Sequence, residues 1–392
     1  MDVDHIEFAF FHGCSYNEIP PERERYHATW VDYPNELFDP ERGHELYRKH
    51  LRLFRLAEEL GFPAVALNEH HNTHFSMAPN VSVMAAAVAV QTQRVKILVA
   101  GVPVNLEYPN RVAEEYAMLD VLSGGRMEFA FPLGTGMEYW SNAGQINPVT
   151  SRARFRESLD VILQAWTADG PTRFDGEFFN YRFLNSWPRP YQKPHPKIFI
   201  VGSGSQETVE LAVDYGAGYS IVLVPIQAQL RAFERMRELA ADRGREVEPD
   251  DLIVVVLVHV AETDEEAIAE MRPHVETFFS WSHRIPPKYL LPPGYVSTAE
   301  YLRRASDTAL AHGTEATWEQ MVEIARLACG SPGTVADLLV EWAREAGCSR
   351  MNVIFEQADM PEWKVVKSMT LFAEEVMPRV QARLVRTPAA VS

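Results

Sequence analysis

Eight short apolar segments, each followed by a helix-length amphipathic segment, set the strongest constraint on how this chain can fold. Alternation of this kind favours a parallel β-sheet, and eight such units are typical of a closed (β/α)8 barrel, the TIM barrel. Periodicity alone does not separate a closed barrel from an open doubly wound sheet, so it is the count of eight that favours the barrel. The apolar segments begin near residues 6, 64, 95, 127, 198, 219, 252 and 351.

The chain has 392 residues, more than the roughly 250 typical of this α/β fold. The surplus follows predicted strands, in segments 12–42, 134–150, 170–196 and about 280–330. We expect one barrel domain over residues 1–392, with the last segment inserted over the mouth at the carboxyl ends of the strands. Segment 170–196 is rich in proline and aromatic residues, which predicts a surface crossing without regular structure.

Aromatic residues of the insertion are candidates for a lid over the mouth. Trp281, Tyr289 and Tyr295 would exclude water and contact a partly apolar substrate. Simple packing of the insertion onto the barrel explains the same residues equally well.

Composition excludes several classes of function. The chain carries 54 acidic and 37 basic residues, a formal net charge of −17, which argues against a nucleic-acid partner. The three cysteines are widely separated and have no CxxC spacing, so we expect a reducing compartment and no disulfide framework. The N-terminus lacks the pattern of a signal peptide, and the longest apolar stretches are too short to span a bilayer. We therefore predict a soluble, cytoplasmic protein.

Titratable residues follow the second predicted strand, where α/β enzymes keep their chemistry. Adjacent residues at a strand end point to opposite sides, so only one of His70 and His71 can face the mouth. We favour His70 as a catalytic proton donor or acceptor; a pair of histidines hydrogen-bonded in the barrel rim is the plain alternative. His74 raises the idea of a metal, but HH-x-x-H without a neighbouring cysteine or carboxylate set is a weak signal, and we predict none.

A glycine-rich segment, 202–208, follows the fifth predicted strand and opens a helix. Glycines let a backbone approach an anion closely, and the N–H groups at a helix start carry partial positive charge. Gly202, Gly204, Ser205 and Thr208 are therefore candidate cofactor-binding residues for a phosphate. The alternative is an ordinary turn with Ser205 as the helix N-cap.

Small residues after the third and fourth strands could contact a flat cofactor ring. Ala100, Gly101 and Val102 end the third strand, where the alternative is a tight strand exit before Pro103. Gly134 follows the fourth strand in a second permissive loop. No G-x-S-x-G motif is present, so acyl transfer by that route is not expected.

Five segments in a fixed order make the chain similar to the bacterial luciferase-like flavin-dependent monooxygenases. The resemblance runs from residue 8 to about residue 380, and it implies a (β/α)8 barrel with an insertion over the mouth. The five segments are LNEHH (67–71), YPNRVAEE (108–115), LDVLSGGR (119–126), PRPYQKPHP (188–196) and GSPGTV (330–335).

The resemblance also implies an activity and its cofactors. Such an enzyme takes reduced FMN from a separate flavin reductase and uses dioxygen to oxygenate a small organic substrate through a peroxyflavin, and a homodimer is implied. His70 matches the family's active-site histidine, and Ser205 and Thr208 match hydroxyls that hold the flavin phosphate. Residues 100–102 match a stretch whose non-proline cis peptide backs the flavin ring.

The chain departs from the luciferase pattern at three positions. Leu133 stands where a phosphate-binding arginine is expected, Pro132 replaces a reactive cysteine, and Gly204 replaces a glutamate. Phosphate anchoring should therefore differ in detail, and light emission is not predicted. Two alternatives stay open: a deazaflavin-dependent oxidoreductase that transfers hydride, and a non-catalytic flavin-binding subunit. The sequence names neither the substrate nor the type of oxygenation.

Overall fold

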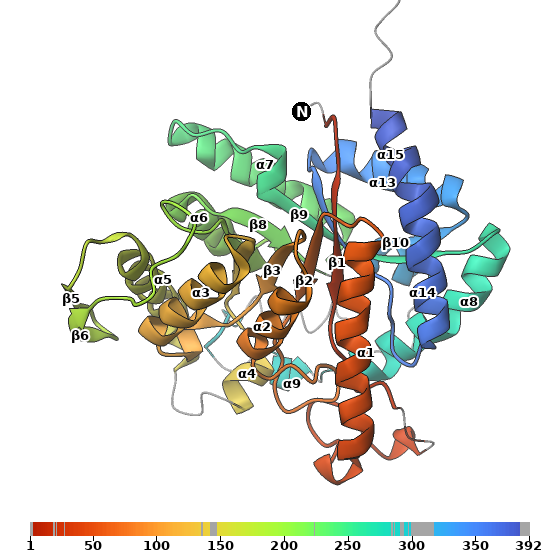
Figure 1. Ribbon diagram of the computed structural model, residues 1–392, viewed down its shortest axis with the longest axis horizontal. Helices are drawn as coiled ribbons and strands as arrows, with labels where there is room; N and C mark the ends of the chain where they lie inside the picture. The colour runs from red at the N-terminus through yellow and green to blue at the C-terminus, as the bar shows by residue number, and fades with distance from the viewer. Residues whose placement is uncertain are drawn as a thin grey trace, which may run out of the picture.

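Eight parallel strands close into a barrel in the computed structural model of the chain (Figure 1). The structure describes residues 3–384 except 19, 21, 27, 135, 142–146, 223, 284, 286, 291–293, 297 and 299–316. β1 pairs with both β2 and β11. The additional pairing of β8 with β9 closes the ring of strands. The predicted barrel is confirmed. Its strands are β1 (Glu7–His12), β2 (Ala64–Leu67), β3 (Lys96–Ala100), β4 (Met127–Pro132), β7 (Ile198–Gly202), β8 (Gly218–Ile221), β9 (Leu252–Val260) and β11 (Arg350–Ile354).

Alternate residues of each strand face the barrel interior and the surrounding helices. In β1, Ala9 and Phe11 belong to the interior cluster, whereas Phe10 packs against Phe54 on the helix side. Small and large side chains share this interior, which fills it with side chains and leaves no pore. The interior cluster consists of Ala9, Phe11, Ala64, Ala66, Leu98, Ala130, Phe199, Ile253 and Val255.

A buried ion pair lies near the end of the barrel where the strands begin. Arg350, which is 3% exposed, donates two hydrogen bonds to the carboxylate of Glu128. It also contacts Glu7 Oε1 at 3.0 Å and lies over the Phe199 ring at 5.0 Å. Because buried charges are tolerated only when paired, this network fixes the register of β1, β4 and β11 at that end.

Helices cover the outside of the barrel, as Figure 1 shows. Local sequence sets several of their ends: Asp39 accepts the backbone N–H groups of Glu41 and Arg42 at the start of α1, and Gly124 ends α3 with a φ of 71°. The helices are α1 (Pro40–Glu59), α2 (Val81–Gln91), α3 (Pro109–Ser123), α5 (Ser151–Thr167), α6 (Gln206–Tyr215), α7 (Ile226–Asp242), α8 (Asp264–Thr277), α12 (Trp318–Ala325), α13 (Pro332–Ala346), α14 (Glu362–Leu371) and α15 (Met377–Leu384).

Short elements lie over the mouth. α8 continues into a π-helical turn, Phe278–Ser282, and α9 (Pro287–Leu290) packs against α4 (Gly136–Ser141). The structure describes part of the predicted insertion at about 280–330, and residues 299–316 of it lie outside the described residues. Among the helices that the structure describes, none is both long and apolar enough to cross a membrane.

Two features of the fold differ from the sequence-based expectation. Segment 170–196 contains an antiparallel hairpin, β5 (Thr172–Asp175) and β6 (Asn180–Leu184), so the prediction of no regular structure there was wrong. The carboxylate of Glu157 on α5 accepts the backbone N–H groups of residues 177–179 and holds the hairpin turn. An additional strand, β10 (Leu327–Gly330), pairs with the second half of β9.

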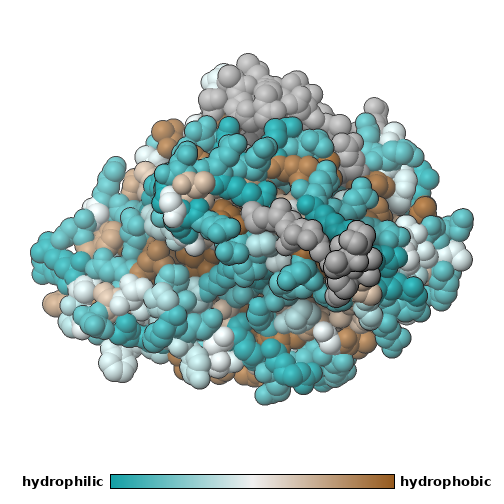
Figure 2. Space-filling model, turned by 90° about the horizontal axis from the view of Figure 1, so that it is seen from above, coloured by the Kyte–Doolittle hydropathy of each residue, from teal (hydrophilic) through white to brown (hydrophobic). Residues whose placement is uncertain are grey.

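The face of the molecule seen from the top of Figure 1 is mostly hydrophilic. Figure 2 shows charged and polar residues over most of this face, with hydrophobic residues in smaller areas between them. This agrees with the acidic composition of the chain.

Candidate active site

His70 lies at the mouth of the barrel, just after β2, and contacts a buried carboxylate. Its Nδ1 is 3.2 Å from Oε1 of Glu138 on α4, and Glu138 is 4% exposed. The rings of Trp30 and Phe75 flank the imidazole at 4.9 and 5.4 Å. Because the carboxylate accepts from Nδ1–H, the other ring nitrogen, Nε2, is the one that can exchange a proton with a ligand.

His71 pairs with a different carboxylate. Its Nε2 lies 3.2 Å from Glu69 Oε1, and Glu69 Oε2 accepts the Val81 N–H at the start of α2. Burial opposes protonation of His71, but the hydrogen bond and charge of Glu69 raise its pKa above the ordinary value. The two histidines therefore contact different carboxylates.

His74 is not part of a metal cluster with the other two. Its Nδ1 donates to the Tyr16 carbonyl at 2.9 Å, and burial lowers its pKa. Its ring lies 4.7 Å from that of the predicted lid residue Trp281 and 5.2 Å from that of Tyr33. No group of metal-ligand type among the described residues includes His70, His71 or His74.

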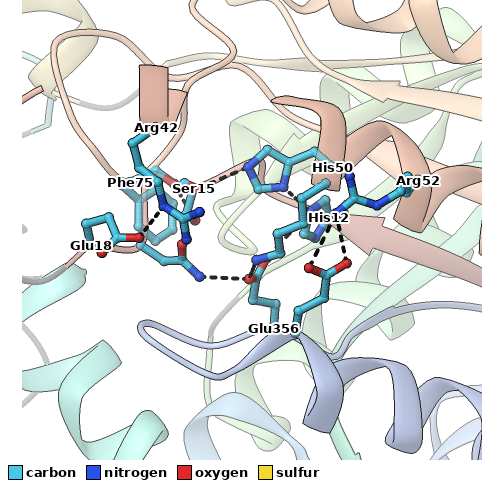
Figure 3. A network of polar contacts seen from close by, with 11 residues as sticks. His12, Ser15, Glu18, Arg42, His50, Arg52, Phe75 and Glu356 are labelled. Atoms are coloured by element: carbon cyan, nitrogen blue, oxygen red, sulfur yellow. Dashed lines mark hydrogen bonds and ion pairs between the residues drawn. The ribbon is translucent and has the colours of Figure 1, made fainter. Parts of the chain in front are cut away.

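A separate buried group, His12, Cys14 and His50, has the composition of a metal site. Figure 3 shows His12 and His50 pointing toward each other near Glu356. His12 Nε2 donates to His50 Nδ1 at 2.7 Å, and His50 Nε2 donates to the Ser15 carbonyl at 3.1 Å. Burial lowers the pKa of His50 to about 3, so its ring is neutral. These nitrogens already have partners, which identifies the group as a structural hydrogen-bond chain.

The predicted phosphate segment joins β7 to α6. Ser205 caps α6 by accepting the Thr208 N–H at 3.4 Å, and Gly204 has a φ of +86°. Thr208 Oγ1 lies 2.7 Å from the Tyr219 hydroxyl, and a Cβ at Gly202 would lie 2.3 Å from that same hydroxyl. Gly204 and Ser205 therefore line an open cavity, whereas Thr208 and Gly202 face Tyr219 in the barrel wall.

The cavity beside this segment has a volume of about 760 Å³ and is rich in arginine. Sequence reasoning missed these arginines, because Arg152 on α5 and Arg231 on α7 are 79 positions apart in the chain and meet only in the fold. It also missed Glu138 and Tyr219. The cavity is lined by Arg152, Ser203, Gly204, Ser205, Gln206, Glu207, Ala228, Arg231, Ala232, Arg235, Gly294, Tyr295 and Val296.

Residues 100–102 end β3 in close contact with β4. A Cβ at Gly101 would lie 1.9 Å from the Ala130 carbonyl oxygen, so no side chain fits there, and Val102 N–H donates to the Tyr116 hydroxyl at 3.4 Å. The expected non-proline cis peptide is not present: all cis bonds in the described part of the chain precede prolines. Residues 100–102 therefore differ in this respect from the stretch that they match in the resemblance.

The three predicted lid residues occupy different places over the mouth. Trp281 is buried against His74, and Tyr289 belongs to α9, whose backbone would lie 1.9 Å from a Cβ at Gly136 on α4. Tyr295 donates its hydroxyl to the Gly134 carbonyl at 2.7 Å and lines the arginine cavity. The insertion thus contacts both the loop that carries His70 and the predicted phosphate site.

His283 completes the aromatic surroundings of His70. Its ring lies 5.6 Å from Phe75 and stacks on Phe278 at 5.4 Å. Burial, with a smaller effect from His70, lowers the pKa of His283 to about 4. At neutral pH this ring is uncharged, so the partly apolar character of the mouth is preserved.

Comparison with known proteins gives a consistent family match. Residues 32–350 match the family model described as luciferase-like monooxygenase. The oxygenase component of flavin-dependent trigonelline monooxygenase from Acinetobacter baylyi is 27% identical over 259 residues, which cover 62% of this chain and 68% of that protein. The alkanal monooxygenase alpha chain of Photobacterium leiognathi is 24% identical over 352 residues, covering 86% of this chain and 94% of that protein.

Solved structures share the fold. The monooxygenase RslO1 from Streptomyces bottropensis superposes with a TM-score of 0.72 at 22% identity, covering 95% of this chain and 99% of that chain. An F420-dependent secondary alcohol dehydrogenase, in complex with an F420-acetone adduct, superposes with a TM-score of 0.66 at 17% identity, covering 96% and 99% of the two chains. At these identities the likeness shows the fold alone.

Proposed function

This chain belongs to the luciferase-like monooxygenase family, and we propose that it is the oxygenase component of a two-component flavin-dependent monooxygenase. It would use reduced FMN and dioxygen to oxygenate a small organic substrate. The pair of His70 and Glu138 carries this proposal, because it puts an oriented proton donor or acceptor at the mouth, where barrels of this kind hold their chemistry.

The described residues fit a flavin that carries a phosphate. Ser203, Gly204 and Ser205 border a cavity lined by arginines, and the buried Nε of Arg152 has no hydrogen-bond partner among the described residues. These residues would hold the phosphate, and residues 100–102 would lie against the ring, where Gly101 has no room for a side chain. The bound flavin supplies the reaction with dioxygen.

His70 would move a proton at the substrate or at the reacting oxygen. Glu138 accepts from Nδ1–H, which fixes the ring orientation and tautomer. Nε2 is then left to donate or accept the proton. Trp281 and Tyr289, packed over the mouth, would exclude water from the reacting atoms.

The test is anaerobic mixing of the purified protein with reduced FMN, followed by rapid exposure to oxygenated buffer. We expect reduced FMN to bind, and its reoxidation on the protein to be slower than that of free reduced FMN, because the site keeps water away. Flavin absorbance and released hydrogen peroxide are recorded together. Absence of binding would contradict the proposal, and so would reoxidation at the rate of free flavin.

Hydride transfer with a deazaflavin is the second candidate. The likeness to an F420-dependent dehydrogenase and the size of the arginine-lined cavity favour it, since a larger anionic cofactor would find room there. The same purified protein, mixed with reduced FMN and separately with a reduced deazaflavin, distinguishes the two by which cofactor binds. A non-catalytic flavin-binding subunit has no need of the oriented His70.

We also propose that a separate reductase serves this protein and that the protein is a homodimer. The name of the trigonelline relative, an oxygenase component, supports a reductase that supplies the reduced flavin. We place this system in the cytoplasm. Measurement of the molecular mass in solution tests the dimer. Activity with chemically reduced FMN and no added reductase tests whether a separate protein supplies the reduced flavin.

A further inference from the structure

The described lining of the arginine-lined cavity has more positively than negatively charged side chains. It lies between the start of α6, one face of α7 and residues 294–296 of the insertion. Three arginines line it, against the single carboxylate of Glu207. Such a concentration is unusual in a chain with a formal net charge of −17, and guanidinium groups are the side chains best suited to bind phosphate.

Arg231 and Arg235 have no neutralising partner among the residues that the structure describes. Both are exposed residues of α7, four positions apart on one helix face, and neither has a hydrogen bond or ion pair with any residue that the structure describes. Two like charges at this spacing destabilise a helix unless an anion lies between them. Both line the same cavity as Gly204 and Ser205.

Arg152 connects this cavity to the insertion. Its Nη1 donates to the Tyr295 carbonyl at 2.8 Å, and its guanidinium lies over the Tyr295 ring at 5.6 Å. Its Nε is buried and has no hydrogen-bond partner in the described part of the chain. The Tyr295 hydroxyl in turn donates to the Gly134 carbonyl at the barrel mouth. One side chain therefore touches both the cavity and the segment that closes over it.

We propose that this cavity binds the cofactor's terminal phosphate, that Arg231 and Arg235 supply the charge that the chain lacks at Leu133, and that Arg152 couples phosphate binding to closure of residues 294–296. The inference rests on the proposed function, since it assumes a flavin at the mouth. It goes further in assigning the anchoring charge to α7 and in linking cofactor binding to the lid through Arg152 on α5.

Binding measurements with two flavins test the charge assignment. Reduced FMN and reduced riboflavin, which lacks the phosphate, are titrated anaerobically into the wild-type protein. We expect FMN to bind roughly ten- to a hundredfold more tightly. In Arg231→Gln and Arg235→Gln the affinity for FMN should fall roughly three- to tenfold, while that for riboflavin stays unchanged.

Arg243→Gln is the matched control. It removes the same charge just beyond the end of α7, where Arg243 pairs with Asp214 outside the cavity, and FMN affinity should not change. Glutamine is a good helix former, so the three variants should keep the fold, which circular dichroism checks. Equal affinity of the wild type for the two flavins would overturn the charge assignment alone. If neither flavin binds, the proposed function fails with it.

Hydrogen exchange tests the coupling to the lid. We expect FMN, but not riboflavin, to slow exchange of the backbone amides around Tyr295. In Arg152→Gln, at FMN concentrations that saturate the protein, this protection should be lost. Equal protection by both flavins, or full protection by FMN in Arg152→Gln, would overturn the coupling.

Discussion

His70 and His71 are adjacent in the sequence but contact different carboxylates. The geometry of a strand end predicts that only one of them faces the mouth. β2 ends at Leu67, so both histidines lie in the loop beyond the strand. Glu138, which orients His70, lies 68 positions away in the chain. No local pattern pairs these two residues, because α4 reaches His70 only through the packing of the loops over the mouth.

Replacing His70 tests its role directly. His70→Ala should lower kcat with reduced FMN by about 10²–10⁴-fold, the usual contribution of a general acid or base. His71→Ala is the control, because the His71 ring pairs with Glu69 and not with Glu138, and its kcat should change far less. Steady-state product formation measures both. Equal turnover in wild type and His70→Ala would remove His70 from the mechanism.

Ser205 and Thr208 show how similar residues acquire different surroundings. Both were predicted as phosphate ligands from one short segment. In the structure Ser205 lines the cavity, while the Thr208 hydroxyl lies 2.7 Å from the Tyr219 hydroxyl in the barrel wall. Direct binding of phosphate by Thr208 stays a prediction, and Ser205, Arg231 and Arg235 are the better placed residues.

At the scale of elements, the close approach of β3 to β4 depends on one glycine. Gly101→Ala would put a Cβ 1.9 Å from the Ala130 carbonyl oxygen, so the strands must shift. We expect a loss of about 2–4 kcal/mol of unfolding free energy, in the range of severe overpacking.

Gly333→Ala is the matched control for that change. Gly333 lies in the first turn of α13, and a Cβ there meets no atom within 4 Å. This variant should be neutral, or more stable by up to about 1 kcal/mol, because alanine favours helix. Denaturant unfolding measures both variants. A Gly101→Ala protein as stable as wild type would contradict the close contact.

The β5–β6 hairpin is an element that the local amino-acid composition did not predict. Proline and aromatic residues predicted irregular backbone over 170–196, and the second part of that segment has none of the regular elements. In the first part, Glu157 satisfies three backbone N–H groups of the turn at once. A contact from α5, rather than the local residues, decides that this turn forms.

At the scale of the whole molecule, buried neutral histidines make the free energy of unfolding depend on pH in the acid range. Burial lowers the pKa of five of them, while in the unfolded chain each takes up a proton near pH 6.5. Below that pH the unfolded chain binds more protons than the folded one, so stability falls as pH falls. The five are His12, His50, His74, His259 and His283.

The variant His283→Gln tests how much one of these histidines contributes to the pH dependence of stability. The folded chain keeps His283 neutral down to about pH 4, so wild type loses stability from this group between about pH 6.5 and 4. In the variant, the slope of unfolding free energy against pH in that window should decrease by up to about 1.4 kcal/mol per pH unit, the value for one proton. Urea unfolding at several pH values measures it. Identical slopes in the two proteins would show that His283 titrates normally when folded.

The sequence by itself determined the eight strand and helix units, their order and the positions of Ser205 and His70 at strand ends. These depend on periodicity and end signals within a few residues, so a local pattern is sufficient. Only the tertiary structure decided that the sheet closes, that Glu138 meets His70, and that Arg152, Arg231 and Arg235 share one cavity. Those contacts join distant parts of the chain, and their geometry depends on how the helices pack around the barrel.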